Sequence, residues 1–250
     1  MIKFFRHFRK SLLRKNKIGK YFKYAIGEIV LVVIGILIAL GINNWNESIK
    51  INKKTNNYLK ALNTEIETNI NVLEEHISIV HRDIEESAKT RKLLNISEAK
   101  FYNDSVLKYS MISRPIYKAN LVKSTFNDLI NSGILENIDD LKLKNNILSI
   151  PSSIDILNEN YLNARDSWIN YQLPYLMKYA DVSNNWDSLS GIKIEKLPFK
   201  RIKKAFIYNS EYANILALRM RMVNNYEETL IELRENLSSI SKNIKLFLKE

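Results

Sequence analysis

The sequence predicts an all-α protein with one N-terminal transmembrane helix, followed by a helical domain that contains long coiled-coil-like helices. Three observations lead to this fold class: an apolar run over residues 24–42, two long stripes of apolar residues at helical spacing, and very few turn residues. After residue 42 the chain holds only two glycines and four prolines. Sheet proteins of this size need many more turn residues, so we expect helices throughout.

The apolar run over residues 24–42 has the length and the borders of a membrane span. As a helix its nineteen residues cover about 28 Å, close to the roughly 30 Å of a bilayer core. Tyr24 lies at one end and Trp45 just beyond the other, the positions at which aromatic side chains meet lipid headgroups. The exception is Glu28, which lies about one turn inside and can reach the headgroup region.

Two other interpretations of this run stay open. A helix in the core of a soluble domain has the same composition, but its basic flank and aromatic borders would then be coincidences. A cleaved signal peptide also has a basic start and an apolar stretch, and Ala39-Leu40-Gly41 resembles its small-residue cleavage site. The length of the run favours a permanent anchor.

The positive charge lies almost entirely before the span. The formal net charge is +11, but residues 1–23 hold nine of the basic residues and no acid, which leaves 29 basic and 27 acidic residues afterwards. A DNA-binding domain carries such charge on its folded part, so we expect no nucleic-acid partner. Only four basic residues follow the span closely, so the N-terminus is expected in the cytoplasm and residues 43–250 outside. Residues 1–23 then form a basic cytoplasmic segment, a candidate interfacial helix on anionic lipid.

The stretch KYFKYAIGEIVLVVIGILIALGINNWNE, residues 20–47, resembles the start of a large bacterial family of single-span inner-membrane proteins. Their signature is Y-A-I-G-E-I at the start of the span and I-N-N-W-N-E after it. A second, weaker similarity is to the family's T-x-x-x-L-x-x-S-G-x-L-x-x-I stretch, which is matched here by Thr125, Leu129, Ser132, Gly133, Leu135 and Ile138. The resemblance implies an uncleaved anchor in the inner membrane and a periplasmic location for residues 43–250. It implies no activity.

Two long helices are expected after the span, over about 46–94 and 210–249. The first carries apolar residues about 3.6 positions apart: Leu59, Leu62, Ile66, Ile70, Leu73, Ile77, Val80, Ile84 and Ala88. The second alternates steps of three and four, as in a coiled-coil seam: Val223, Tyr226, Leu230, Leu233, Leu237, Ile240, Ile244 and Phe247. Each stripe needs a partner, which is either the other helix packed antiparallel or a second copy of the chain.

Shorter helices are expected between the two long ones. Thr125 and Asp128 have the spacing of a capping box, and Gly133 is placed to end the helix between them. Pro151 is expected to begin a further helix, which Pro174 kinks or ends.

Residues that carry out chemistry are scarce. The chain has no cysteine, which excludes disulfides and thiolate ligands, and no glycine-rich phosphate loop. His76 and His81 are about 140° apart on a helix, so they do not share a metal-binding face. His81 and Glu85 could form half a metal site, although the same spacing is typical of a solvated side-chain pair. We therefore expect no catalytic, cofactor-binding or metal site and no enzyme activity.

Two groups of residues are candidates for binding. An aromatic stripe could line a ligand pocket, although such a stripe usually belongs to a core: Tyr161, Trp168, Tyr171, Tyr175 and Tyr179. In the span, Glu28, Gly35, Ala39 and Ile42 lie within about 40° of one angle around the helix. Gly35 and Ala39 are a small-residue pair that lets two helices approach closely, so we predict a transmembrane packing face and a homodimer. The alternative is that Glu28 only reaches a nearby lysine.

Two functions of different classes are consistent with this reading. The first is a membrane-anchored helical periplasmic protein with a structural or interaction role, whose protein partners are unknown. The alternative is a sensor that binds a small ligand and signals through its single span to a cytoplasmic partner. In both cases membrane lipid is a partner of the span.

Overall fold

A computed structural model of the chain describes residues 18–94, 115–180, 188–189, 192–193, 205–206 and 208–249, with residues 195 and 198. The expected basic segment therefore lies mostly outside the described residues. The chain divides into two units, residues 1–57 and 58–250.

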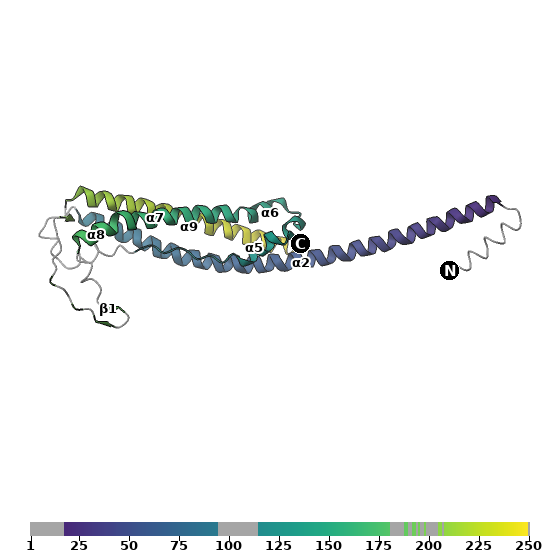
Figure 1. The fold of residues 1–250 in the computed structure, drawn as a ribbon, viewed down its shortest axis with the longest axis horizontal. Helices are drawn as coiled ribbons and strands as arrows, with labels where there is room; N and C mark the ends of the chain where they lie inside the picture. The colour runs from purple at the N-terminus through teal and green to yellow at the C-terminus, as the bar shows by residue number, and fades with distance from the viewer. Residues whose placement is uncertain are drawn as a thin grey trace. The chain divides into compact units, whose positions relative to one another are not determined.

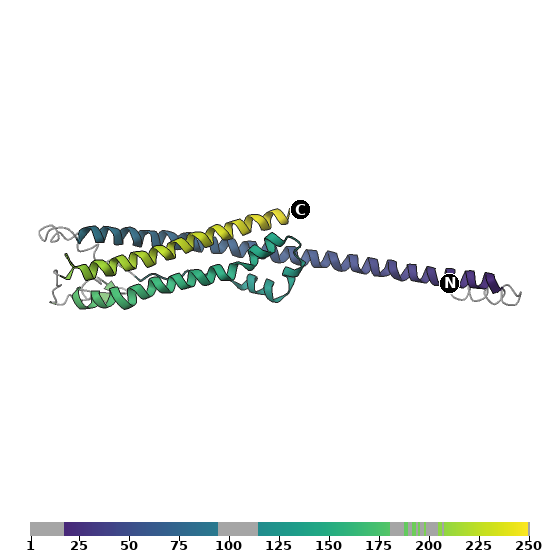
Figure 2. The ribbon, with the colours of Figure 1, turned by 90° about the horizontal axis from the view of Figure 1, so that it is seen from above.

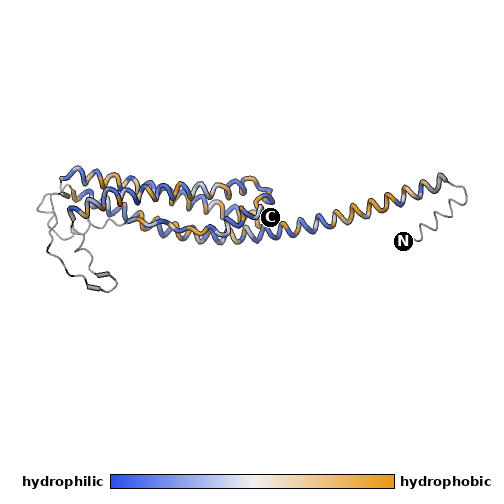
Figure 3. Tube along the Cα trace, in the orientation of Figure 1, coloured by the Kyte–Doolittle hydropathy of each residue, from blue (hydrophilic) through white to orange (hydrophobic). Residues whose placement is uncertain are grey.

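The described part of the first unit is the beginning of α2 (Ile18–Leu93). Its most apolar 18-residue window has a mean hydropathy of 2.8, and none of the window is buried (Figure 3). Among the described residues this is one helix that is long and apolar enough to cross a membrane. The absence of burial contradicts the alternative of a core helix.

The span and the helix expected over about 46–94 are not separate elements, because α2 continues without a break from one to the other. Residues 43–46 contain three asparagines but no proline. An asparagine costs a helix at most about 0.7 kcal/mol relative to alanine, whereas proline costs about 3 kcal/mol. The polar residues that follow the apolar run therefore do not end the helix.

The second unit is a bundle of helices (Figures 1 and 2). Its elements after α2 are α5 (Ser124–Asn131), the 3₁₀ helix η1 (Ile134–Asn137), α6 (Leu141–Leu148), α7 (Ile150–Ser167), the π-helix η2 (Trp168–Gln172), α8 (Leu173–Tyr179) and α9 (Ser210–Phe247). The described residues also include one antiparallel pair of two-residue strands, β1 (Ser188–Leu189) and β2 (Ile192–Lys193). The fold is otherwise helical, as the sequence predicts.

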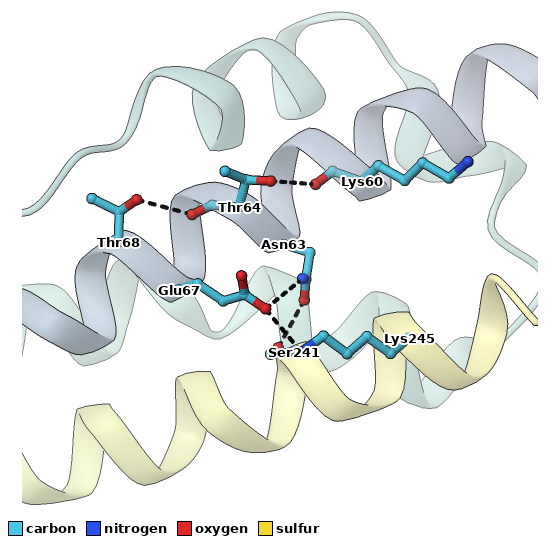
Figure 4. Close-up of polar contacts among 7 residues, drawn as sticks. All are labelled: Lys60, Asn63, Thr64, Glu67, Thr68, Ser241 and Lys245. Atoms are coloured by element: carbon cyan, nitrogen blue, oxygen red, sulfur yellow. Dashed lines mark hydrogen bonds and ion pairs between the residues drawn. The ribbon is translucent and has the colours of Figure 1, made fainter.

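The second part of α2 packs antiparallel to α9. Asn63 accepts a hydrogen bond from the Ser241 hydroxyl at 2.8 Å, and farther along α2, Asp83 pairs with Arg219. Residues closer to the end of α2 thus contact residues closer to the start of α9. Figure 4 shows the first of these regions, where Lys245 also forms a 2.8 Å ion pair with Glu67. Of the two partners considered for these stripes, the one seen within the chain is therefore the other helix, packed antiparallel.

The main core lies between α2, α7 and α9, with α5 and α6 packed against it. Seven of the eight predicted stripe residues of α9 are buried, and the eighth, Phe247, is partly buried against the same core. From α2 the core takes Leu59, Leu62, Ile66, Leu73 and Val80. The helical periodicity therefore identified the buried face of both long helices.

The predicted capping box of α5 is wrong. The N-cap of this helix is Lys123, and no side chain of its own segment caps it. Glu65 on α2 caps it instead, accepting hydrogen bonds from the backbone N–H groups of Thr125 and Phe126. Gly133 follows the helix with φ = 67°, a left-handed conformation that favours glycine, as expected.

Proline positions shape the segment from α7 to α8. Pro151 lies in the first turn of α7, as predicted, where its missing N–H costs nothing. Before Pro174 the helix widens into η2, in which the N–H of Leu173 bonds the carbonyl of Trp168, five residues earlier. This widened turn lets the chain pass into α8, where Pro174 again lies in the first turn.

Candidate functional site

A second cluster of buried side chains lies where α2 ends and α9 begins. It consists of Leu94, Tyr175, Leu176, Ala205, Phe206, Tyr212 and Leu216. The N–H of Tyr208 donates to the carbonyl of Leu94 at 3.1 Å, which joins the two chain segments. Asn209 then caps α9, because its side chain accepts from the N–H of Tyr212 at 3.0 Å. The start of α9 is therefore held by both a local cap and a distant backbone contact.

Three aromatic rings form the centre of this cluster. Tyr175 stacks on Tyr212 with ring centroids 5.2 Å apart, and Phe206 packs edge-on against both. The Tyr175 hydroxyl donates a hydrogen bond to the carbonyl of Ala205. Burial raises the pKa of Tyr175 to about 12 and also raises the pKa of Tyr212. Both phenols are therefore neutral hydrogen-bonding groups at physiological pH.

A buried ion pair lies two turns along α9 from Tyr212. The Arg219 side chain is fully buried, and its Nη2 donates to Oδ2 of Asp83 on α2 at 3.0 Å. Burial raises the pKa of Asp83 although Arg219 attracts its negative charge, and burial also lowers the pKa of Arg219. Both pKa shifts favour the uncharged form of the side chain. The cost of removing the two charges from water therefore opposes the attraction between them.

The π-helix η2 contributes a third polar group. Gln172, its last residue, is fully buried and forms a side-chain hydrogen bond with Tyr212. Short π-helical turns inside α-helices are frequent at functional sites, as are buried charges. Arg219, Asp83, Gln172 and Tyr212 together form a polar group beside the aromatic rings, and we take this polar and aromatic cluster as the candidate site.

Sequence reasoning missed most of this site, although one signal was present. Arg219 continues the alternating three- and four-residue steps of the α9 stripe toward Leu216 and Tyr212. A charged residue at a position of an apolar stripe indicates a buried charge that needs a partner. The partner, Asp83, is 136 residues away, and only the packing of α2 on α9 brings the two together.

The predicted aromatic stripe does not form one surface. Tyr161 is partly buried in the main core, with its ring 5.8 Å from that of Tyr226. Tyr175 and Tyr179 belong to the second cluster, whereas Tyr171 is 55% exposed. The cause is η2, whose extra residue per turn rotates the later aromatic side chains out of register with the earlier ones.

His81 pairs across helices instead of forming half a metal site with Glu85. Its Nδ1 lies 2.8 Å from Oε1 of Glu227 on α9, and its Nε2 lies 3.8 Å from Oε1 of Glu85. Within the part of the chain that the structure describes, no three histidine, aspartate or glutamate side chains are grouped to hold a metal ion.

The predicted transmembrane packing face is open within the single chain. An added Cβ at Gly35 would meet no atom within 4 Å, and Ile42 is 61% exposed. Ala39 is exposed as well, and Glu28 is partly exposed. The association of two spans through this face stays a prediction.

The chain matches no protein-family model, and no curated protein or solved structure is significantly similar to it. The resemblance to the single-span bacterial family therefore stays an expectation from the quoted motifs.

Proposed function

We propose that the protein is a membrane-anchored helical protein with a structural or interaction role in the bacterial envelope. The observation that carries this proposal is the apolar window of α2, which has a mean hydropathy of 2.8 and no buried residue. Exposed apolar surface of this extent is unfavourable in water and favourable in lipid. The basic residues before the span support a cytoplasmic N-terminus and a periplasmic position for residues 43–250.

The architecture of the second unit supports an interaction role. The stripe of α9 has the 3.5-residue repeat of a coiled coil, and its buried members contact a core shared with α2 and α7. Helices of this length present long continuous faces to solvent, which suit the docking of other helices.

A second candidate function is that of a ligand sensor. The polar and aromatic cluster favours it. Burying an arginine beside a π-helical turn has a desolvation cost that an apolar side chain would avoid, so this arrangement is unusual in a purely structural bundle. The two functions differ in what copurifies with the intact protein. A stable envelope partner supports the interaction role, whereas a bound metabolite without a protein partner supports the sensor.

The orientation can be tested by cysteine labelling, because the chain has no cysteine of its own. Ser238→Cys places a thiol on the exposed surface of α9, and Ser11→Cys is the matched control before the span. A membrane-impermeant maleimide, added to cells with a permeabilised outer membrane, should label position 238 and not position 11.

Labelling at position 11 alone would overturn the proposed orientation. Mass spectrometry of the purified protein gives the second readout, since an uncleaved anchor retains its first residues. A mature N-terminus at residue 42 would show that the span is a signal peptide.

A further inference from the structure

A shallow groove runs along the contact between α7 and α9. It has a volume of about 230 Å³ and is lined by Ser153, Ile156, Thr229, Glu232, Leu233 and Asn236. The Asn236 amide approaches the Ser153 hydroxyl at 3.4 Å at one end of the groove. Leu233 is buried beneath it, and Ile156 is 52% exposed, so part of the surface is apolar and open to solvent.

The groove lies on the side of α9 that is turned away from α2. Glu227 of α9 contacts α2 through His81, and Asn236 lies nine residues later. At 100° per residue the two positions are about 180° apart around the helix. An additional helix placed over the groove would therefore contact α7 and α9 without displacing α2.

One carboxylate lines the groove, and helical spacing places one more on each helix close to it. Glu232 is part of the lining, Glu228 lies one turn before it on α9, and Glu159 lies one turn after Ile156 on α7. All three are exposed, and in the described part of the chain Glu159 and Glu232 have no cationic partner within 4.0 Å. Residues 24–250 are nearly neutral overall, so this is a local concentration of negative charge.

We propose that the groove between α7 and α9 docks a basic amphipathic helix of a partner protein. A helix suits it because the groove follows two antiparallel helix axes, the arrangement in which a further helix completes a bundle. Its apolar face covers Ile156, and its lysine or arginine side chains face Glu159, Glu228 and Glu232. The inference rests on the proposed interaction role and gives the chemistry of the partner.

The test uses full-length protein in nanodiscs of phosphatidylcholine, whose headgroups carry no net charge. The probe is a fluorescein-labelled 18-residue amphipathic helix of leucine and lysine, and its control is the same peptide with glutamate in place of lysine. Fluorescence anisotropy gives the Kd for the wild type and for Glu232→Lys, Ile156→Asp and Glu75→Lys. The last is a matched control, because Glu75 is an exposed glutamate on α2.

We expect Glu232→Lys and Ile156→Asp each to weaken binding of the lysine peptide roughly tenfold or more. Glu75→Lys should change the Kd less than about twofold, because it alters net charge away from the groove. Circular dichroism of each variant confirms that the bundle is folded, and both groove substitutions replace exposed side chains.

Equal weakening by all three variants would show binding by overall charge and would overturn the inference. Equal affinity for the glutamate peptide, or equal binding to empty nanodiscs, would overturn it too. If the protein self-associates and both groove substitutions abolish this, the groove binds a second copy of the chain. That result would overturn the inference of a partner protein. If position 238 is labelled as expected but the peptide binds the wild type and the groove variants equally, only the groove inference fails. If position 11 is labelled instead of position 238, the proposed location fails.

Discussion

Glu65 on α2 caps the N-terminus of α5, accepting a hydrogen bond from the N–H of Thr125 at 2.7 Å. The same carboxylate accepts from the N–H of Phe126 at 3.1 Å and from the Ser124 hydroxyl. One turn along α2, Asn69 pairs with both the N–H and the carbonyl of Val122. Two residues of α2 thus hold the chain that leads into α5 across more than fifty residues of sequence.

We predict that Glu65→Ala lowers the free energy of unfolding by about 1–3 kcal/mol, because buried backbone donors lose their acceptor. The measurement is urea denaturation of the full-length protein in detergent micelles, followed by circular dichroism. Glu74→Ala is the control, since Glu74 is an exposed glutamate on the same helix. Equal effects of the two substitutions would show that the cap contributes no stability.

The buried ion pair gives a second prediction. Arg219→Leu should destabilise the fold by about 3–5 kcal/mol, because Asp83 loses its partner while it stays largely buried. The double variant Asp83→Leu/Arg219→Leu should recover most of that loss, since neither charge then has to leave water. A double-mutant cycle from urea denaturation measures the coupling. Additive losses in the double variant would contradict this account.

The raised pKa of Asp83 predicts a pH dependence with a definite sign. Between the ordinary pKa of 3.8 and the raised value, the folded protein binds a proton at Asp83 that the unfolded chain does not. Binding of this proton stabilises the folded protein. The stabilisation is fully present below pH 3.8 and is lost as the pH rises through the raised pKa of Asp83. The wild type should therefore lose stability relative to Asp83→Asn over this interval. A relative gain would show that attraction to Arg219 exceeds the cost of burial.

The packing face of the span predicts a difference between two substitutions. In a transmembrane association reporter carrying residues 20–47, Gly35→Ile should weaken dimerisation because it separates the two helix backbones. Val33→Phe adds bulk on the opposite face and should have little effect. A monomeric wild-type span, or equal behaviour of both variants, would leave Glu28 as an interfacial carboxylate without a partner helix.

The sequence alone determined the features that depend on local spacing. The apolar run, the stripes of α2 and α9, the left-handed Gly133 and the first-turn Pro151 all follow from side-chain chemistry within a few residues. Helical periodicity shows which face of a helix is buried. Glycine and proline have backbone preferences that hold wherever they occur in a chain. For this reason the helical class and the buried faces of the two long helices were predictable.

Only the tertiary structure decided which distant groups meet. The capping box at Thr125 and Asp128 had the right spacing, but Glu65 from another helix accepts from the N–H groups of Thr125 and Phe126 and caps the helix instead. The pairing of Arg219 with Asp83 likewise depends on the register between packed helices. That register is set by the sum of many side-chain contacts in the core, whereas spacing along one segment specifies only which face is buried.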